Sequence, residues 1–259
     1  MPTYQQMVEE IAHHLQNAGR LLFITGAGIS AESGLPTYRG IGGLYEGNLT
    51  EMNLPIEEVL SGHMFSARPE VVWKFILQIE KATRGATYNK AHKIIADLQE
   101  NHEVWVLTQN IDGFHHAAGS KNVIDIHGDI HSILCTRCDY QTQVPDYSGF
   151  TEIPPLCPNC SAVLRPDVVL FGEMLPAKKV ALLERELSKG FDMVFSVGTT
   201  SVFPYIAAPV YDAAREGIPT VEINPTETSV STIVDYKLAE KASIALSDIM
   251  HTLNAHLPS

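Results

Sequence analysis

Apolar residues follow two different periods along this chain. Over residues 7–18, Val8, Ile11 and Leu15 recur at helical spacing, and similar periods over residues 71–82 and 90–99 predict two further helices. Gly19 is expected to end the first helix. Shorter, nearly continuous apolar runs predict buried strands, at "RLLFIT" (20–25), "VWVLT" (104–108), "NVIDIHG" (122–128), "DVVLFGE" (167–173), "DMVFSVGTTS" (192–201) and "PTVEIN" (219–224).

These continuous strand runs, with helical stretches between them, are typical of a parallel sheet that is covered on both faces. We therefore expect an α/β fold, a Rossmann-like parallel sheet with helices on both faces. Residues 40–87 and 131–164 interrupt the alternation and are expected to form a small inserted module. The Rossmann-like part would then comprise residues 1–39, 88–130 and 165–259, and residues 1–259 would act as a single unit.

Glycine and polar clusters begin where several of the apolar runs end. They are "GAGIS" (26–30), "QNID" (109–112), "HG" (127–128) and "GTTS" (198–201). Ligands of open α/β sheets bind beyond the carboxyl ends of the strands. The sequence therefore predicts that these clusters meet at one rim of the sheet and form one site.

The glycine cluster is consistent with a phosphate-binding turn. Gly26 and Gly28 would let backbone N–H groups approach a pyrophosphate, and Ser30 could cap the helix or bind a phosphate. The third glycine, Gly34, comes later than in the dehydrogenase fingerprint, and no strand with an acidic end follows on schedule. Taken alone, the pattern fits an ordinary strand–helix turn equally well. The irregular stretch that follows suits a mobile lid, in which Arg39 could contact a phosphate or a carboxylate or simply be solvated.

All the cysteines of the chain lie in two Cys-x-x-Cys pairs, with eighteen residues between the pairs. Two such pairs can supply four thiolates at tetrahedral geometry and leave no open position, so a structural zinc site is predicted. A redox role is the alternative, but catalytic Cys-x-x-Cys motifs normally occur singly. The predicted metal ligands are Cys135, Cys138, Cys157 and Cys160.

Charge and composition exclude some classes of protein. The 259 residues carry a formal net charge of −12, and the 18 lysines and arginines are scattered, which disfavours binding to nucleic acid or to anionic membranes. No apolar run approaches the length of a membrane span, and residues 1–19 do not resemble a signal peptide. A cytoplasmic protein is expected, and its oligomeric state stays open.

Seven segments are informative in combination. They are "GAGISAESGLPTYRG" (26–40), "TQNIDGFHHAAG" (108–119), "HG" (127–128), the two cysteine pairs, "RPDVVLFGE" (165–173), "GTTSVFP" (198–204) and "IN" (223–224). In this order the chain resembles the sirtuins, the NAD-dependent protein-lysine deacylases, and in particular bacterial-type members. The family loop usually reads "GIPDFR", whereas this chain has Thr37 and Tyr38 at the Asp and Phe positions. The resemblance implies a Rossmann-like domain with an inserted zinc-binding module.

The resemblance also implies how NAD is held. Its phosphates would lie along Gly26, Ala27, Gly28, Ser30 and Glu32, with Tyr38 and Arg39 in the lid. Nicotinamide would lie against Gln109, Asn110, Ile111 and Asp112, and the adenosine part against Gly198, Thr199, Ser201, Asn224 and Ala242. From the residues alone, a cap on the helix that begins nearby is favoured over a ligand contact for Asp112.

His127 matches the catalytic histidine of the family, and Asn110 is its expected catalytic partner. By resemblance, the acyl-lysine oxygen attacks C1′ of the nicotinamide ribose, nicotinamide leaves, and His127 then activates a ribose hydroxyl. The products are free lysine and O-acyl-ADP-ribose. The resemblance places the acyl-lysine protein or peptide against Val168, Phe171, Gly172 and Glu173.

Acyl preference is predicted from the helix over residues 71–82. Some members that remove succinyl or malonyl groups carry a Tyr and an Arg three residues apart, and the corresponding positions here are Ile76 and Ile79. Neither can pair with a carboxylate, so neutral acyl groups are expected, namely acetyl and longer chains. The alternatives are an NAD-dependent mono-ADP-ribosyltransferase, a zinc-ribbon nucleic-acid binder and a dehydrogenase. The intact Asn110 and His127 disfavour the transferase, and the net charge disfavours the nucleic-acid binder. The dehydrogenase lacks its acidic ribose-binding residue.

Overall fold

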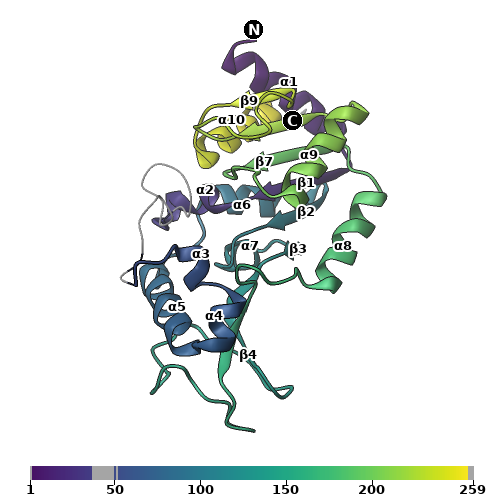
Figure 1. Ribbon diagram of the computed structural model, residues 1–259. Coiled ribbons are helices and arrows are strands. Elements are labelled where there is room, and N and C mark those ends of the chain that lie inside the picture. Colours follow the sequence, from purple (N-terminus) through teal and green to yellow (C-terminus); the bar gives the residue numbers. More distant parts are fainter. Residues whose placement is uncertain (1, 37–49, 51, 256–259) are drawn as a thin grey trace.

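A computed structural model describes residues 2–36, 50 and 52–255 of the chain (Figure 1). Its larger part is a six-stranded parallel sheet with the order β3-β2-β1-β7-β8-β9. The strands are β1 (Arg20–Thr25), β2 (Glu103–Thr108), β3 (Asn122–Asp125), β7 (Met193–Val197), β8 (Thr220–Ile223) and β9 (Tyr236–Leu238). The strand order reverses between β1 and β7, and this switch point is where open α/β sheets bind ligands.

The inner strands of this sheet, β2, β1, β7 and β8, bury side chains on both faces, which explains the continuous apolar runs. Leu21 and Phe23 of β1 join one hydrophobic core, whereas Leu22 and Ile24 join another. Three helices pack on the first face, α1 (Tyr4–Asn17), α6 (Lys90–Asp97) and α10 (Ala242–Ala255). The second face is covered by α8 (Ala177–Ser188) and α9 (Pro204–Glu216) (Figure 1).

A second core lies beside the large sheet. Here β4 (Gly128–Cys135) pairs antiparallel with β5 (Gln141–Gln143) and with β6 (Leu164–Val168). Three helices pack against this small sheet, α3 (Ile56–Val59), α4 (Gly62–Ala67) and α5 (Pro69–Thr83). The indole Nε1 of the fully buried Trp73 donates to the Leu164 carbonyl at 2.8 Å, which fastens α5 to β6.

Short elements complete the described chain. They are α2 (Ala27–Ser30), α7 (Phe114–Ala118) and the 3₁₀ turns η1 (Ala31–Ser33) and η2 (Leu98–Glu100). None of the helices in the described part of the chain has the length and apolar character needed to cross a bilayer.

The expected fold class is confirmed, and so are the three predicted helices, as α1, α5 and α6. The predicted strand over residues 167–173 is wrong, because β6 ends at Val168 and belongs to the small antiparallel sheet. Val168, Leu170 and Phe171 instead enter the second core, and within residues 169–173 the one β-bridge described joins Phe171 to Ser61. An apolar run reports burial, and it does not report which sheet the strand joins.

Candidate active site

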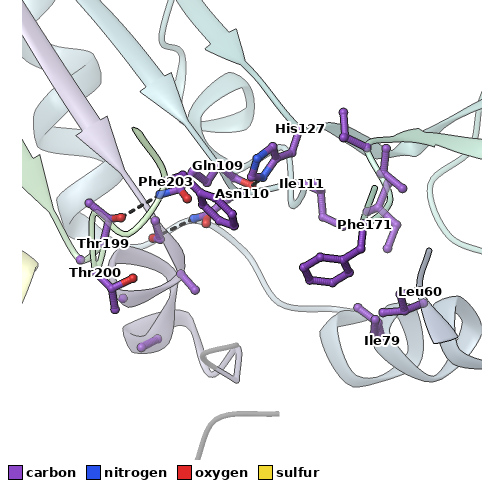
Figure 2. Close-up of a pocket in the computed structure, with 18 of the residues that line it drawn as sticks. Leu60, Ile79, Gln109, Asn110, Ile111, His127, Phe171, Thr199, Thr200 and Phe203 are labelled. Carbon is purple, nitrogen blue, oxygen red and sulfur yellow. Dashed lines mark hydrogen bonds between the residues drawn. The ribbon is translucent and has the colours of Figure 1, made fainter. Parts of the chain in front are cut away.

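Loops from the carboxyl ends of the strands surround one cavity of about 740 Å³ (Figure 2). The predicted site residues that line it are Gly26, Ala27, Gly28, Glu32, Gln109, Asn110, Ile111, His127, Val168, Phe171, Gly172, Glu173, Gly198, Thr199, Asn224 and Ala242. Ser30, Asp112 and Ser201 are not among the residues that line it. Tyr38 and Arg39 fall outside the described residues. The four clusters that the sequence places at strand ends therefore share one cavity.

The floor of the cavity is a backbone contact between the loops after β1 and β7. The Gly28 amide donates to the Gly198 carbonyl at 2.8 Å, and the Gly198 amide donates to Ile223 at 3.0 Å. A Cβ at Gly28 would lie 2.7 Å from the Gly198 Cα. Only glycine permits this approach, since carbon atoms otherwise pack about 3.5–4.0 Å apart. Gly28 of "GAGIS" and Gly198 of "GTTS" are therefore both required by the same close contact between their backbones.

Side-chain amides connect the neighbouring strand ends above this floor. Gln109 donates to the Thr199 hydroxyl at 2.7 Å, and Asn224 donates to the Thr199 carbonyl at 3.1 Å. The buried Asn110 donates from Nδ2 to the Gly26 carbonyl at 3.0 Å and to the Ser30 hydroxyl at 3.1 Å. With its amide hydrogens used in this way, the Oδ1 oxygen is the atom through which Asn110 can meet a ligand.

The Asp112 carboxylate accepts two hydrogen bonds from other protein groups. It accepts from the Ser30 hydroxyl at 2.7 Å and from the Phe114 amide at 3.0 Å, at the start of α7. Burial raises the pKa of the Asp112 carboxyl, and these two hydrogen bonds oppose the rise. Asp112 therefore accepts from the first amide of α7 and, through Ser30, also orients Asn110.

His127 sits where β3 passes into β4, on the cavity wall. Gly128 follows it at φ +93°, and a Cβ there would meet the Asp167 carbonyl. This glycine therefore lets the chain turn from the large sheet into the small one at the histidine. Nδ1 of His127 lies 2.9 Å from the Gln109 carbonyl, and Nε2 lies 2.6 Å from the Tyr205 hydroxyl. Burial lowers the pKa of His127, so the neutral imidazole persists at a lower pH than for an exposed histidine.

The other end of the cavity is apolar. It is lined by Leu60, Ile76, Ile79, Ile111, Ile130, Val168, Leu170 and Phe171, on α5, β4 and the segments beside them (Figure 2). Among the described residues lining the whole cavity, Lys241 is the only lysine or arginine, and it adjoins α10. An extended aliphatic chain fits this end, and a carboxylate finds no described lysine or arginine on its lining.

Two acidic residues predicted for the site are engaged by other protein groups. Glu173 accepts two hydrogen bonds from Arg165, at 2.7 and 2.9 Å, which fixes the segment after β6. Glu32 accepts from the amide of Ser243 at 2.9 Å, at the start of α10. Both carboxylates therefore hold the cavity wall in place.

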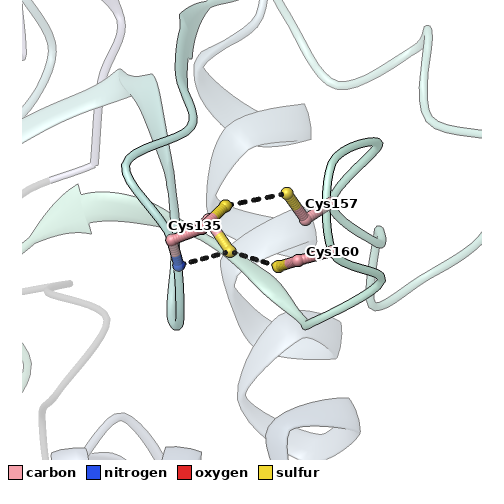
Figure 3. A group of neighbouring side chains, drawn as sticks. Cys135, Cys157 and Cys160 are labelled. Carbon is pink, nitrogen blue, oxygen red and sulfur yellow. Dashed lines mark hydrogen bonds between the residues drawn. The ribbon is translucent and has the colours of Figure 1, made fainter.

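The four cysteines converge at the end of the small sheet (Figure 3). All four Sγ atoms lie within 4.8 Å of one another, and no disulfide joins them. The Cys135–Cys160 and Cys138–Cys157 sulfur pairs are 3.4 and 3.5 Å apart. Tetrahedral zinc with bonds of about 2.3 Å would separate its sulfurs by about 3.8 Å, so these cysteines are positioned to bind a structural metal ion.

Several residues on the cavity wall were not predicted. Thr200, Phe203 and Tyr205 follow the glycine turn after β7, and Leu60 and Leu170 extend the apolar end. Phe203 and Tyr205 flank Pro204, the first residue of α9, and this proline is the only local signal that the chain turns there. Spacing alone cannot reveal that the Tyr205 hydroxyl reaches a histidine 78 residues away.

The glycine floor, the histidine between the two sheets and the cysteine cluster define a class of Rossmann-like proteins with a metal-binding insertion. The chain belongs to the Sir2 family, whose model matches residues 26–204. It is 46% identical to NAD-dependent protein deacylase 2 of Pseudomonas aeruginosa, over 96% of this chain and 97% of that protein. The deacylase 2 of Pseudomonas syringae pv. tomato is 47% identical, over 93% and 98%.

Solved structures are also similar to this chain. A complex of a Sir2 homologue with NAD has a TM-score of 0.82 at 35% identity, covering 95% of this chain and 94% of that one. A complex of Sir2 with a p53 peptide and NAD⁺ has a TM-score of 0.80 at 29% identity, covering 95% and 98%.

Proposed function

We propose that this protein is an NAD-dependent protein-lysine deacylase that yields nicotinamide and O-acyl-ADP-ribose. The main observation behind this proposal is that Asn110 and His127 line one cavity, between a glycine floor and an apolar end. Support comes from the deacylase names of the Pseudomonas relatives and from the NAD and peptide complexes of the structural neighbours.

The described residues divide the work as follows. The Gly28–Gly198 floor and the amides beside it accommodate the NAD phosphates, and Asn224 and Ala242 bound the adenosine end. Gln109, Asn110 and Ile111, supported by Ser30 and Asp112, hold nicotinamide. NAD supplies the glycosidic carbon at which nicotinamide leaves and to which the acyl oxygen adds. His127 takes a proton from a ribose hydroxyl, and one water is consumed overall.

The neutral imidazole is well suited to this task. A carbonyl oxygen can only accept a hydrogen bond, so the contact with Gln109 places the proton on Nδ1. Nε2 is then the basic atom, and the lowered pKa of His127 favours its unprotonated form at neutral pH. The enzyme contributes positioning and a base, and it needs no nucleophile of its own.

We also propose a preference for acetyl and longer neutral acyl groups. Ile76 and Ile79 place two aliphatic side chains where an acyl chain would lie. The Arg165 guanidinium is already paired with Glu173. A succinyl carboxylate buried against this surface would have to lose its water without gaining a partner.

The four cysteines would hold zinc as a structural ion that ties the two ends of residues 131–164 together. We assign residues 40–87 and 131–164 to the inserted module, and support comes from the core that α3, α4 and α5 share with β4 and β6, two strands that extend beyond these bounds. A cytoplasmic enzyme that acts without nucleic acid or membrane fits the net charge of −12.

The direct test incubates the protein with NAD and an acetyl-lysine peptide and identifies the products by mass. We expect nicotinamide, the free-lysine peptide and O-acetyl-ADP-ribose, with a loss of about 10²- to 10⁴-fold in His127→Ala. Transfer of ADP-ribose to protein, with the acetyl group retained on the peptide, would instead establish the ADP-ribosyltransferase alternative.

A further inference from the structure

Both nitrogen atoms of the His127 imidazole have a protein partner. The Gln109 carbonyl, 2.9 Å away, requires the proton to be on Nδ1, so neutral Nε2 is an acceptor. The group that donates to Nε2 is the hydroxyl of Tyr205, at 2.6 Å. The basic atom of the proposed catalytic residue is therefore already hydrogen-bonded to a phenol before any substrate is considered.

Tyr205 is held in this place by aromatic packing. Its ring stacks on Phe203, with centroids 5.6 Å apart and planes 15° apart, and meets the His127 ring edge-on at 5.9 Å. Phe203 also meets the His127 ring edge-on, at 6.1 Å. For a ribose hydroxyl to reach Nε2 directly, Tyr205 would have to leave both its hydrogen bond and this stack.

A phenol hydroxyl can donate and accept at the same time. While the Tyr205 hydroxyl donates to His127, its oxygen keeps acceptor capacity, and Tyr205 lines the same cavity as the histidine. An alcohol bound in the cavity can therefore donate to the tyrosine oxygen without displacing it.

We propose that Tyr205 relays the proton of the ribose hydroxyl to His127. The inference rests on the proposed deacylase function and adds a residue to its proton path. As the ribose oxygen bonds to the acyl carbon, its proton moves to the Tyr205 oxygen and the tyrosine proton moves to Nε2. Tyrosine ends neutral, and the imidazolium holds a proton that it can return to the departing lysine amine. This proton transfer itself requires no reactant besides the bound substrates.

The test compares Tyr205→Phe with Tyr211→Phe. Tyr211 lies on the same helix, and its hydroxyl donates to the Ser229 carbonyl at the surface, so this control also removes one tyrosine hydroxyl. Two rates are measured with an acetyl-lysine peptide: exchange of labelled nicotinamide into NAD, and formation of O-acetyl-ADP-ribose. Exchange precedes the use of the ribose hydroxyl, and it also reports whether each variant is folded.

We expect Tyr205→Phe to retain exchange and to lose product formation by about 10- to 100-fold, because a positioned proton-transfer group is missing. The solvent deuterium isotope effect on product formation should also change in this variant, since one of the two transferred protons is lost. Tyr211→Phe should match the wild type in both rates.

Product formation by Tyr205→Phe at the wild-type rate with an unchanged isotope effect would overturn the relay. Faster product formation would overturn it too, since the tyrosine would then obstruct the base. Wild-type protein that neither exchanges nicotinamide nor forms product would instead refute the proposed function on which the relay depends.

Discussion

Replacing Gly28 by alanine tests the backbone contact on which the cavity floor depends. The added Cβ would lie 2.7 Å from both the Cα and the carbonyl oxygen of Gly198. Carbon atoms pack about 3.5–4.0 Å apart, so the two loops would have to separate by nearly 1 Å. The obstructing atoms belong to the backbone, so no side-chain rotation can relieve the overlap. The Gly198 amide also donates a hydrogen bond to the Ile223 carbonyl, which holds this loop in place.

The expected cost follows from the size of this overlap. Overpacking of a well-packed site costs about 1–3 kcal/mol. Separation of the loops would also stretch the 2.8 Å hydrogen bond from Gly28 to Gly198, worth about 1 kcal/mol. For a chain of this length, the combined loss of about 2–4 kcal/mol lowers the unfolding midpoint by about 4–16 °C. NAD affinity should fall further than stability does, since the moved loops form the phosphate site.

Thermal unfolding and calorimetric titration with NAD measure the two effects separately. The matched control is Gly149→Ala, because Gly149 is exposed and a Cβ there meets no atom within 4 Å. Its stability should stay within about 0.5 kcal/mol of the wild type. A Gly28→Ala protein with wild-type midpoint and wild-type NAD affinity would refute this account of the floor.

Three further predictions concern the base, the metal and the acyl group. The acidic limb of kcat/KM for O-acetyl-ADP-ribose formation should lie below pH 6.5, since burial lowers the pKa of His127 and the rate requires its neutral form; a limb centred above that value would contradict the assignment. Metal analysis should find about one zinc per chain, and verified zinc removal should unfold the cysteine-containing segment and abolish deacylation; a metal-free protein that stays folded and active would contradict a structural role. Acetyl-lysine peptides should exceed succinyl-lysine peptides in kcat/KM by about 100-fold or more; faster succinyl removal would show that the cavity contains a carboxylate partner.

The sequence predicted the parts of the fold that depend on local pattern. Residues such as Val8 and Ile11 mark one helix face, and the strand runs report burial on both sides of a sheet. Burial does not specify pairing, which is why residues 167–173 were assigned to the wrong sheet. β4 was missed because its residues alternate between buried and partly exposed positions around a bulge.

The site was predictable where a residue type has a chemical reason to be in its motif. Gly28 and Gly198 are needed because two loop backbones approach closely there. The spacing of the two Cys-x-x-Cys pairs by itself indicates a metal site. Tyr205 had no such signal, because its role depends on where α9 places a hydroxyl relative to a strand end far away in the sequence. The dual contacts of Asp112 likewise depend on Ser30 and α7 meeting in space.

The central claim is that one dinucleotide lies between the glycine floor and His127, with its glycosidic carbon open toward the apolar end of the cavity. The most direct test is a crystal structure with NAD and an acetyl-lysine peptide bound. The account predicts the pyrophosphate over Gly28 and Gly198, nicotinamide beside Asn110, and the acetyl-lysine side chain against Ile79 and Phe171. A dinucleotide bound away from Asn110 and His127 would contradict it.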